Sequence, residues 1–217
     1  LSLSAQAQQT WDFLDLSESI PLIEADNINW NVDKYQTDVP IQWSNNIAFT
    51  EWSTLKANGE EIPATKGLMF IGDKGKLLFS ISSKNKNYFK LNNNKAKIKI
   101  CNLKKGQKIT IVGVSGSKEE PRTFTAVENL EVTSGMEPTL EEQTSEAKVM
   151  NDGDIVIGCT NAMNVYSISL SADATGIAQT TISKPSGNDK FYTLDGKQVK
   201  PSHKGIIIAN GKKYTNK

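Results

Sequence analysis

The run KAKIKIC, residues Lys95–Cys101, alternates polar and apolar side chains in a way that decides the fold class. Lys97 and Lys99 share one side of the segment, whereas Ile98 and Ile100 share the other. Successive side chains of a β-strand point to opposite faces, so this period of two predicts a strand with one buried and one solvated face. The segment therefore predicts β structure rather than helix.

Similar short segments, separated by turn residues, recur along the chain. We predict further strands at Leu77–Ile81, Gln107–Val114, Asp154–Cys159 and Val165–Leu170. Many short strands with turns about every ten residues indicate a sandwich or a barrel rather than alternating strands and helices. The predicted fold is all-β, with a jelly-roll-like β-sandwich over residues 10–171.

Helical signals are few. Ser17–Asp26 predicts a short helix with Ser17 as its N-cap and Pro21 in its first turn. Pro138–Lys148 contains three glutamates but only a thin apolar stripe, which predicts a loop or a single helical turn.

The first residues of the chain differ from the rest. Residues 1–9 are predicted to be a signal-peptide remnant or a disordered start, because Ala5 and Ala7 are the small residues that a signal peptidase requires. This segment predicts a secreted, periplasmic or cell-surface protein.

The last residues form a second, smaller pattern. Residues 172–217 are predicted to be a linker followed by a small C-terminal β-hairpin module. Asp195-Gly196 and Asn210-Gly211 each separate two short β-type segments, and both dipeptides favour type I′ turns.

Composition limits the classes of function. Of 217 residues, 37% are hydrophobic and 23% are charged, as in an ordinary globular protein. No apolar run approaches the ~20 residues of a membrane helix, and a formal net charge of +1 by itself predicts no polyanionic partner. Cys101 and Cys159 leave two alternatives open, a disulfide in an exported protein or two buried thiols.

The sequence contains no catalytic or metal-binding motif. The single histidine, His203, lies in a turn of the tail, so neither a Ser-His-Asp nor a Cys-His arrangement is predicted. One histidine and two cysteines are too few for a typical zinc site. Asp152-Gly153-Asp154 is compatible with a structural calcium ion. The segment lacks the spaced oxygen ligands of a calcium loop, however, and a hairpin turn explains it as well. We therefore predict no catalytic residue, no metal ligand and no cofactor.

Charge is segregated along the chain. Residues 84–108 contain nine lysines and no acidic residue, whereas residues 119–146 contain eight glutamates and one basic residue, Arg122. The lysines form either a basic face for an acidic polysaccharide such as a uronan, or a solubilising face that guards strand edges. The second interpretation is favoured because diffuse surface charge marks sites poorly. Nucleic acid is not a predicted partner, since Arg122 is the only arginine.

Two parts of the chain resemble known modules. The segments that carry the first resemblance are Thr10–Phe13, Leu55–Gly59, Gly67–Phe70, Asn102–Ile111 and Asn164–Ile168. Together they resemble the galactose-binding-like β-sandwich modules of secreted Bacteroidetes proteins, which often accompany pectate lyases and other glycan-degrading enzymes. The tail segments Phe191–Val199, Lys204–Ile206 and Asn210–Lys213 resemble the sorting-type C-terminal module of the same group. Neither resemblance carries a catalytic motif.

Aromatic residues give the best clue to a ligand. All four tryptophans lie in the first quarter of the chain. Sugars present apolar C–H faces that stack on exposed rings, and neighbouring amides bond their hydroxyls. Trp11 alternates with Phe13 and is predicted to be core. The candidate ligand-binding residues are Trp30, Tyr35, Trp43, Asn45 and Asn46.

We therefore expect a non-catalytic, secreted or surface-associated protein that binds polysaccharide or another glycan through these residues. This expectation requires Trp30, Tyr35 and Trp43 to be exposed on one rim or concave face. The alternative is a structural or adhesion protein that makes protein contacts at the cell surface. A small lyase or hydrolase is least favoured, because it needs a cleft with paired carboxylates or a carboxylate beside Lys or Tyr.

Overall fold

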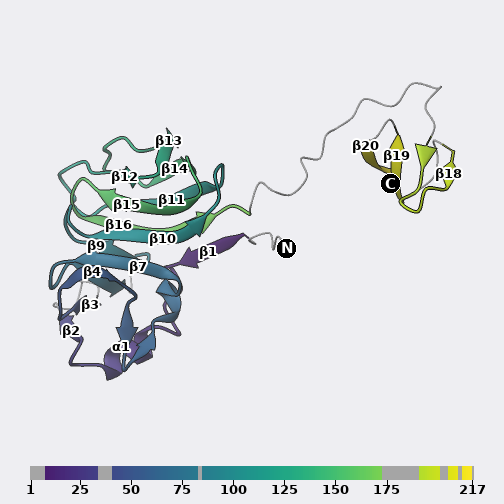
Figure 1. Cartoon of the computed structure of the whole chain (residues 1–217). Helices are drawn as coiled ribbons and strands as arrows, with labels where there is room; N and C mark the ends of the chain where they lie inside the picture. Colours follow the sequence, from purple (N-terminus) through teal and green to yellow (C-terminus); the bar gives the residue numbers. More distant parts are fainter. Residues whose placement is uncertain are drawn as a thin grey trace. The chain divides into compact units, whose positions relative to one another are not determined.

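The chain folds as two compact units, Leu1–Gly176 and Ile177–Lys217, which we call the main unit and the tail unit (Figure 1). The computed structural model describes residues 8–33, 41–82, 85–172, 191–200, 205–209 and 212–216. Almost every element in these ranges is an antiparallel strand, which confirms the all-β prediction. Of the predicted signal-peptide or disordered segment, residues 1–9, only 1–7 lie outside the described residues, whereas Gln9 already belongs to the first strand. Most of the linker, Tyr35 and His203 also lie outside the described residues.

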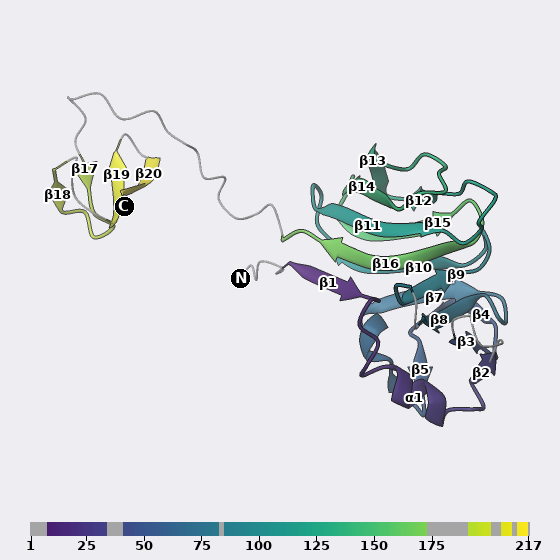
Figure 2. The ribbon, with the colours of Figure 1, turned by 180° about the vertical axis from the view of Figure 1, so that it is seen from behind.

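The larger sheet of the main unit has nine strands. They are β1 (Gln9–Asp12), β2 (Trp30–Asp33), β3 (Ile41–Asn45), β8 (Leu77–Ile81), β9 (Tyr88–Leu91), β11 (Lys108–Ser115), β13 (Leu130–Ser134), β14 (Gln143–Val149) and β16 (Met163–Leu170). Their order is β13-β14-β11-β16-β9-β8-β3-β2, and β1 also pairs with β16. Since β1 pairs with the second half of β16 and β9 with its first half, β1 and β9 follow one another along the same edge of β16 (Figure 2).

The smaller sheet has five strands. They are β4 (Phe49–Ser53), β7 (Leu68–Gly72), β10 (Lys97–Leu103), β12 (Phe124–Glu128) and β15 (Gly153–Cys159), in the order β12-β15-β10-β7-β4. Successive strands from β9 to β12 alternate between the two sheets, which is the jelly-roll-like feature of the sandwich. The short elements are α1 (Ile20–Ala25), β5 (Lys56–Ala57), β6 (Glu60–Glu61) and the 3₁₀ turn η1 (Pro63–Thr65).

The two sheets bury their apolar faces against each other. Phe89 of β9 lies at the centre of an aromatic cluster, with its ring centroid 5.3 Å from Phe13, 5.3 Å from Phe70 and 5.0 Å from Phe79. Phe70 belongs to the smaller sheet, so this cluster joins the two layers. The alternation in β10 places Ile98 and Ile100 in the same core, as the sequence predicts.

The segment Pro138–Lys148 was expected to be a loop or a helical turn, and this prediction is wrong for most of it. Its second half belongs to β14, which pairs with β11 and β13. Two inward residues of β14 are polar, which hides its apolar alternation. Gln143 donates to the Arg122 carbonyl oxygen at 3.0 Å and Ser145 donates to that of Gly135, so both are accommodated in the interior.

The short helix α1 begins later than the sequence predicts. Its N-cap is Ser19 rather than Ser17, and Pro21 lies in the first turn as expected. The Ser17 amide donates instead to Asp15 at 3.0 Å, because the preceding segment forms a turn. The Ser19 hydroxyl accepts the Ala64 amide at 3.0 Å, which ties the helix to the segment around η1.

The tail unit is a sheet of four strands in the order β18-β17-β19-β20. The strands are β17 (Phe191–Tyr192), β18 (Gln198–Val199), β19 (Gly205–Ala209) and β20 (Lys212–Asn216). The turn between β17 and β18 is not type I′, because Gly196 has φ +82° but Asp195 does not have a positive φ. The dipeptide Asn210-Gly211 lies outside the described residues.

Both cysteines of the main unit are free thiols. Burial raises the pKa of the Cys159 thiol to about 12. The pKa of the half-buried Cys101 is also raised, first by burial and then by the charge of Asp154. A thiol above its ordinary pKa holds little reactive thiolate at neutral pH.

We expect two titratable thiols in unfolded protein prepared without reductant. In folded protein at pH 8, alkylation should be slow at both cysteines and slowest at Cys159, because the thiolate is the reactive form. Mass spectrometry of peptides after timed alkylation measures both rates. A protein with no free thiol, or with Cys159 modified first, would contradict the structure.

We expect Phe89→Ala to lower the free energy of unfolding by about 3–5 kcal/mol, because it opens a cavity between the two sheets. Chemical denaturation followed by tryptophan fluorescence measures the loss. The matched control is Ile28→Ala, whose side chain is 75% exposed and whose removal should change stability by less than about 0.5 kcal/mol. Equal effects of the two substitutions would count against the aromatic cluster as the centre of the core.

Candidate functional site

The tryptophans proposed from the sequence as ligand-stacking rings are part of the core. Trp30 is 2% exposed and Trp43 is 1% exposed, so the prediction that these rings are exposed is wrong. The Trp30 ring packs edge-on against Phe79 at 5.3 Å, and its Nε1 donates to the Lys56 carbonyl oxygen at 2.9 Å. Strand alternation places both rings on the inner face of the larger sheet. Tyr35 lies outside the described residues.

The two asparagines proposed beside them bond to the protein itself. The buried Asn45 side chain donates to the carbonyl oxygens of Ile47 and Asp73, at 2.7 and 3.1 Å. Its Oδ1 accepts the amides of Lys76 and Leu77, at 3.0 and 2.9 Å. Asn45 therefore holds two turns together and has no group left for a ligand.

The side chains of Asn46 and of the remaining two tryptophans also contact other parts of the protein. Asn46 donates to the Ile28 carbonyl oxygen at 2.8 Å and accepts the Asn31 amide at 3.0 Å. Trp11 is 4% exposed, which confirms that it is core. Trp52 is half-buried in the smaller sheet, where the Lys99 ammonium lies 4.6 Å from its ring centroid.

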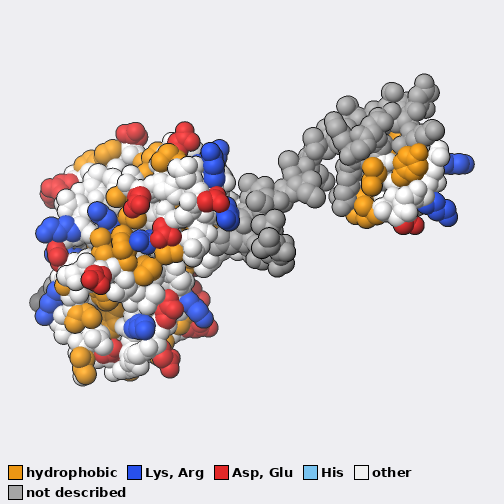
Figure 3. Space-filling view, in the orientation of Figure 1, with side chains coloured by type: hydrophobic (Ala, Val, Ile, Leu, Met, Phe, Trp, Pro, Cys, Tyr) orange, Lys and Arg blue, Asp and Glu red, His pale blue; other side chains and the backbone are white. Residues whose placement is uncertain are grey.

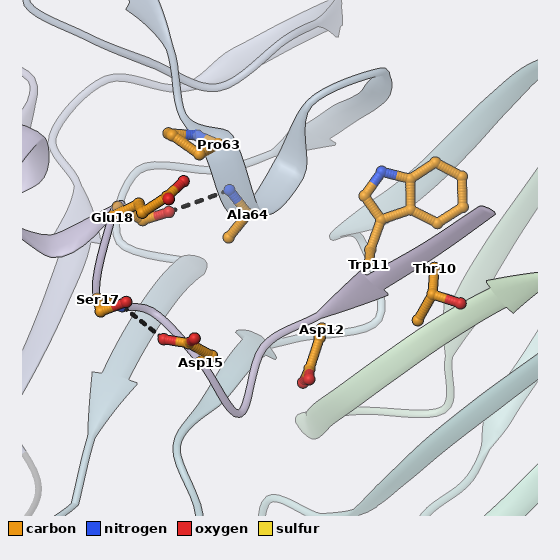
Figure 4. A pocket seen from close by; sticks show the side chains of 9 residues that line it. Thr10, Trp11, Asp12, Asp15, Ser17, Glu18, Pro63 and Ala64 are labelled. Carbon is orange, nitrogen blue, oxygen red and sulfur yellow. Dashed lines mark hydrogen bonds between the residues drawn. The ribbon is translucent and has the colours of Figure 1, made fainter.

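One hollow beside α1 is rimmed by carboxylates but offers no free ligand set (Figure 4). Asp12 accepts the Leu14 amide at 2.8 Å and Asp15 accepts the Ser17 amide at 3.0 Å. Hydrogen bonds from Ser17 lower the pKa of Asp15 below its ordinary range. These carboxylates stabilise turns in the chain entering α1, and among the described residues no group of three His, Cys, Asp or Glu side chains is placed to hold a metal ion.

The larger hollow is a groove on the outer face of the larger sheet, which we call the sheet-face groove. Its volume is about 650 Å³, within the range of small-ligand sites. It crosses β3, β9 and β16 and is bounded by the β8–β9 loop, the segment after β11 and the residue before β14. The lining residues are Gln42, Ser82, Asn85, Lys86, Tyr88, Lys90, Ser115, Gly116, Ser117, Lys118, Glu142, Asn164 and Tyr166.

Two neighbouring strands supply the centre of the groove. Phe89 pairs with Val165 and Lys90 with Asn164 in the register of β9 and β16. Phe89 and Val165 are fully buried, so Tyr88, Lys90, Asn164 and Tyr166 face outward. Two phenol rings thus lie beside an ammonium group and an amide on one open surface.

Hydrogen bonding partly fixes the polar groups of the groove. Gln42 donates to the Tyr88 hydroxyl at 2.9 Å, which holds the amide of β3 against β9. The Asn164 Oδ1 and the hydroxyl of the fully buried Ser80 have no hydrogen-bond partner among the described residues. Ser80 pairs with Gln42 on one side and Tyr88 on the other, so it lies on the face that carries the groove. Both atoms are buried, so each carries the free-energy cost of an unsatisfied polar group.

An ion pair lies over one of the phenol rings. The Lys86 ammonium donates to Glu142 and lies 4.9 Å from the centroid of the Tyr166 ring. The hydrogen bond to Glu142 raises the pKa of Lys86, whereas burial, and then the Glu142 charge, raises that of Tyr166. Both charged side chains are nearly half exposed, so the pair stabilises the protein little and can move aside.

Lys90 differs from the other lysines of the groove. It is half-buried, and no ion pair joins it to any described carboxylate. Burial lowers the pKa of its ammonium group, and the nearby charges of Arg122 and Lys76 lower it further. Arg122 itself is paired with Glu120 at 2.6 Å. The groove therefore contains a positive charge that the described part of the protein leaves uncompensated.

Neither a family model nor a curated protein sequence matches the chain. Within the described ranges, no helix is long and apolar enough to cross a membrane. Basic and acidic side chains are interspersed over the face of the main unit seen in Figure 3, which has no broad field of one sign. The sheet-face groove is therefore the feature from which we infer a function.

Sequence reasoning missed the residues of the groove. The alternation in Tyr88–Leu91 and in Asn164–Tyr166 was a usable signal, because it separates inward apolar residues from outward polar ones. The sequence does not reveal that these two segments are neighbours, since more than 70 residues separate them, as the pairing of Phe89 with Val165 shows.

We expect Asn45→Ala to lower the free energy of unfolding by about 2–4 kcal/mol, because it removes four hydrogen bonds from a buried junction. Asn46→Ala is the matched control and should cost less than about 1 kcal/mol, since its bonds are exposed. Thermal or chemical unfolding measures both. If Asn45→Ala left stability unchanged, the structural role assigned to this residue would be wrong.

Proposed function

We propose that the main unit binds carbohydrate in the sheet-face groove and does not catalyse a reaction on it. The observation that carries this proposal is the placement of Tyr88 and Tyr166 beside Gln42 and Asn164 on the open face of one sheet. A pyranose ring has an apolar face that stacks on a phenol ring, while its hydroxyls exchange hydrogen bonds with amides. The groove offers both kinds of contact on a rigid strand surface.

The shape and chemistry of the groove favour a glycan over an apolar ligand. The surface is open, and polar side chains predominate in its lining. Gln42 and Asn164 place side-chain amides along the lining, and amides exchange hydrogen bonds with sugar hydroxyls. An apolar molecule would cover the polar lining without forming hydrogen bonds to it.

Binding is favoured over hydrolysis by the carboxylates that line the groove. Glycoside hydrolysis generally uses two carboxyl groups on either side of the scissile bond. Glu142 is the one carboxylate among the described lining residues, and it is engaged with Lys86. The resemblance of the chain to galactose-binding-like modules of secreted proteins supports the same proposal, including an extracellular or surface location.

We expect Tyr166→Ala to weaken glycan binding about tenfold, because it removes one stacking ring. Tyr166→Phe should bind like the unchanged protein, since it keeps the ring. Trp52→Ala is the control, because it removes an aromatic side chain from the smaller sheet. A glycan array followed by calorimetry on the best ligand measures these affinities.

Two results would contradict the proposal. Binding unaffected by Tyr166→Ala would place the site elsewhere. If the protein bound no glycan, the alternative from the sequence would be the better explanation: the main unit would make protein contacts at the cell surface.

A further inference from the structure

The most unusual feature of the groove is the pairing of Lys90 with Asn164. The two residues are directly opposite in the register of adjacent antiparallel strands, and both side chains face outward. Side chains in such a pair begin about 5 Å apart. An ammonium donor and a side-chain amide are therefore held within the span of one sugar residue.

The charge balance of the groove is positive. Three lysines line it, Lys86, Lys90 and Lys118, against the single carboxylate of Glu142. Lys86 and Glu142 neutralise each other, whereas Lys90 has no described carboxylate within ion-pair distance. Other positive charges, those of Lys76 and Arg122, lie close enough to act on Lys90, and Glu120 compensates that of Arg122.

A half-buried ammonium without a counter-charge has lost part of its hydration and has gained nothing in exchange. A ligand that brings an anionic group to Lys90 restores this balance and forms a charge-assisted hydrogen bond. A neutral sugar can only offer a hydroxyl oxygen to the same ammonium. The site should therefore distinguish anionic from neutral glycans.

We propose that the sheet-face groove selects glycans with an anionic substituent, and that this group binds Lys90 while a hydroxyl of the same sugar bonds to the side-chain amide of Asn164. The inference rests on the proposed carbohydrate-binding function and adds the class of glycan. The anionic group is a carboxylate, as in a uronic acid, or a sulfate ester, and both satisfy the same donor. Tyr166, two residues beyond Asn164 on the same face of β16, is placed to stack on an adjoining sugar.

The test uses two matched pairs of probes with the full chain. One pair is an oligogalacturonate and its fully methyl-esterified form, and the other is a sulfated galactan oligosaccharide and its desulfated form. We expect at least one anionic probe to bind about tenfold or more tightly than its neutral partner, and this preference should weaken as salt is added.

Substitutions at Lys90 test whether this residue causes the preference for anionic probes. Lys90→Gln should abolish it, whereas Lys90→Arg should retain it, because the positive charge is kept. The matched control is Lys97→Gln, which removes the charge of another half-buried strand lysine, in the smaller sheet. Circular dichroism and thermal unfolding confirm that each variant is folded, and a preference that survives in folded Lys90→Gln overturns the inference.

The remaining outcomes separate this inference from the proposed function. If a glycan array shows only neutral ligands, or if each anionic probe binds like its neutral partner, selection by Lys90 is wrong and carbohydrate binding stands. If no glycan of either kind binds, both are wrong. A preference for the uronate alone or for the sulfate alone identifies the anionic group.

Discussion

The ring of Phe89 between the two sheets is the contact on which the groove depends. It packs against Phe79 of the same sheet, Phe70 of the opposite sheet and Phe13 of the segment after β1. Because side chains alternate along a strand, fixing Phe89 inward fixes Tyr88 and Lys90 outward. The same rule applied to Val165 places Asn164 and Tyr166 beside them. The sheet-face groove thus lies on the outer side of the strands that carry this aromatic cluster, which gives it a rigid base.

The segregation of charge along the sequence has a structural counterpart on the larger sheet. The lysine-rich segment supplies residues of β9 and β11, and the glutamate-rich segment supplies β13, β14 and the residue before it. Lys86 pairs with Glu142 and Lys108 pairs with Glu146, so two ion pairs join the two segments. Lys90 belongs to the same segment but faces Asn164 rather than a carboxylate. Unlike Lys86 and Lys108, it has no described carboxylate within ion-pair distance.

The sequence predicts the fold class well because the signal for a strand is local. The alternation in Lys95–Cys101 correctly separates the buried isoleucines from the outward lysines. The alternation of polar and apolar residues does not predict β14, because Gln143 and Ser145 occupy inward positions there. Both side chains are accommodated through hydrogen bonds to carbonyl groups distant in the sequence. Such hydrogen bonds form only once the chain has folded, so no local sequence pattern predicts them. The candidate site was missed for a related reason: Trp30 and Trp43 were selected by residue type, whereas the groove is defined by which strands are neighbours.

The position of β16 has a consequence for how the main unit assembles. Met163–Leu170 is the last strand of this unit, yet it pairs with β1, β9 and β11. Gln9 is paired with Leu170, so the first and last strands of the larger sheet are hydrogen-bonded to each other. A sheet of such high contact order cannot close until nearly all of its chain has emerged from the ribosome. Until then the edges of β1, β9 and β11 that accept β16 are without their partner, and the groove does not exist because β16 supplies Asn164 and Tyr166.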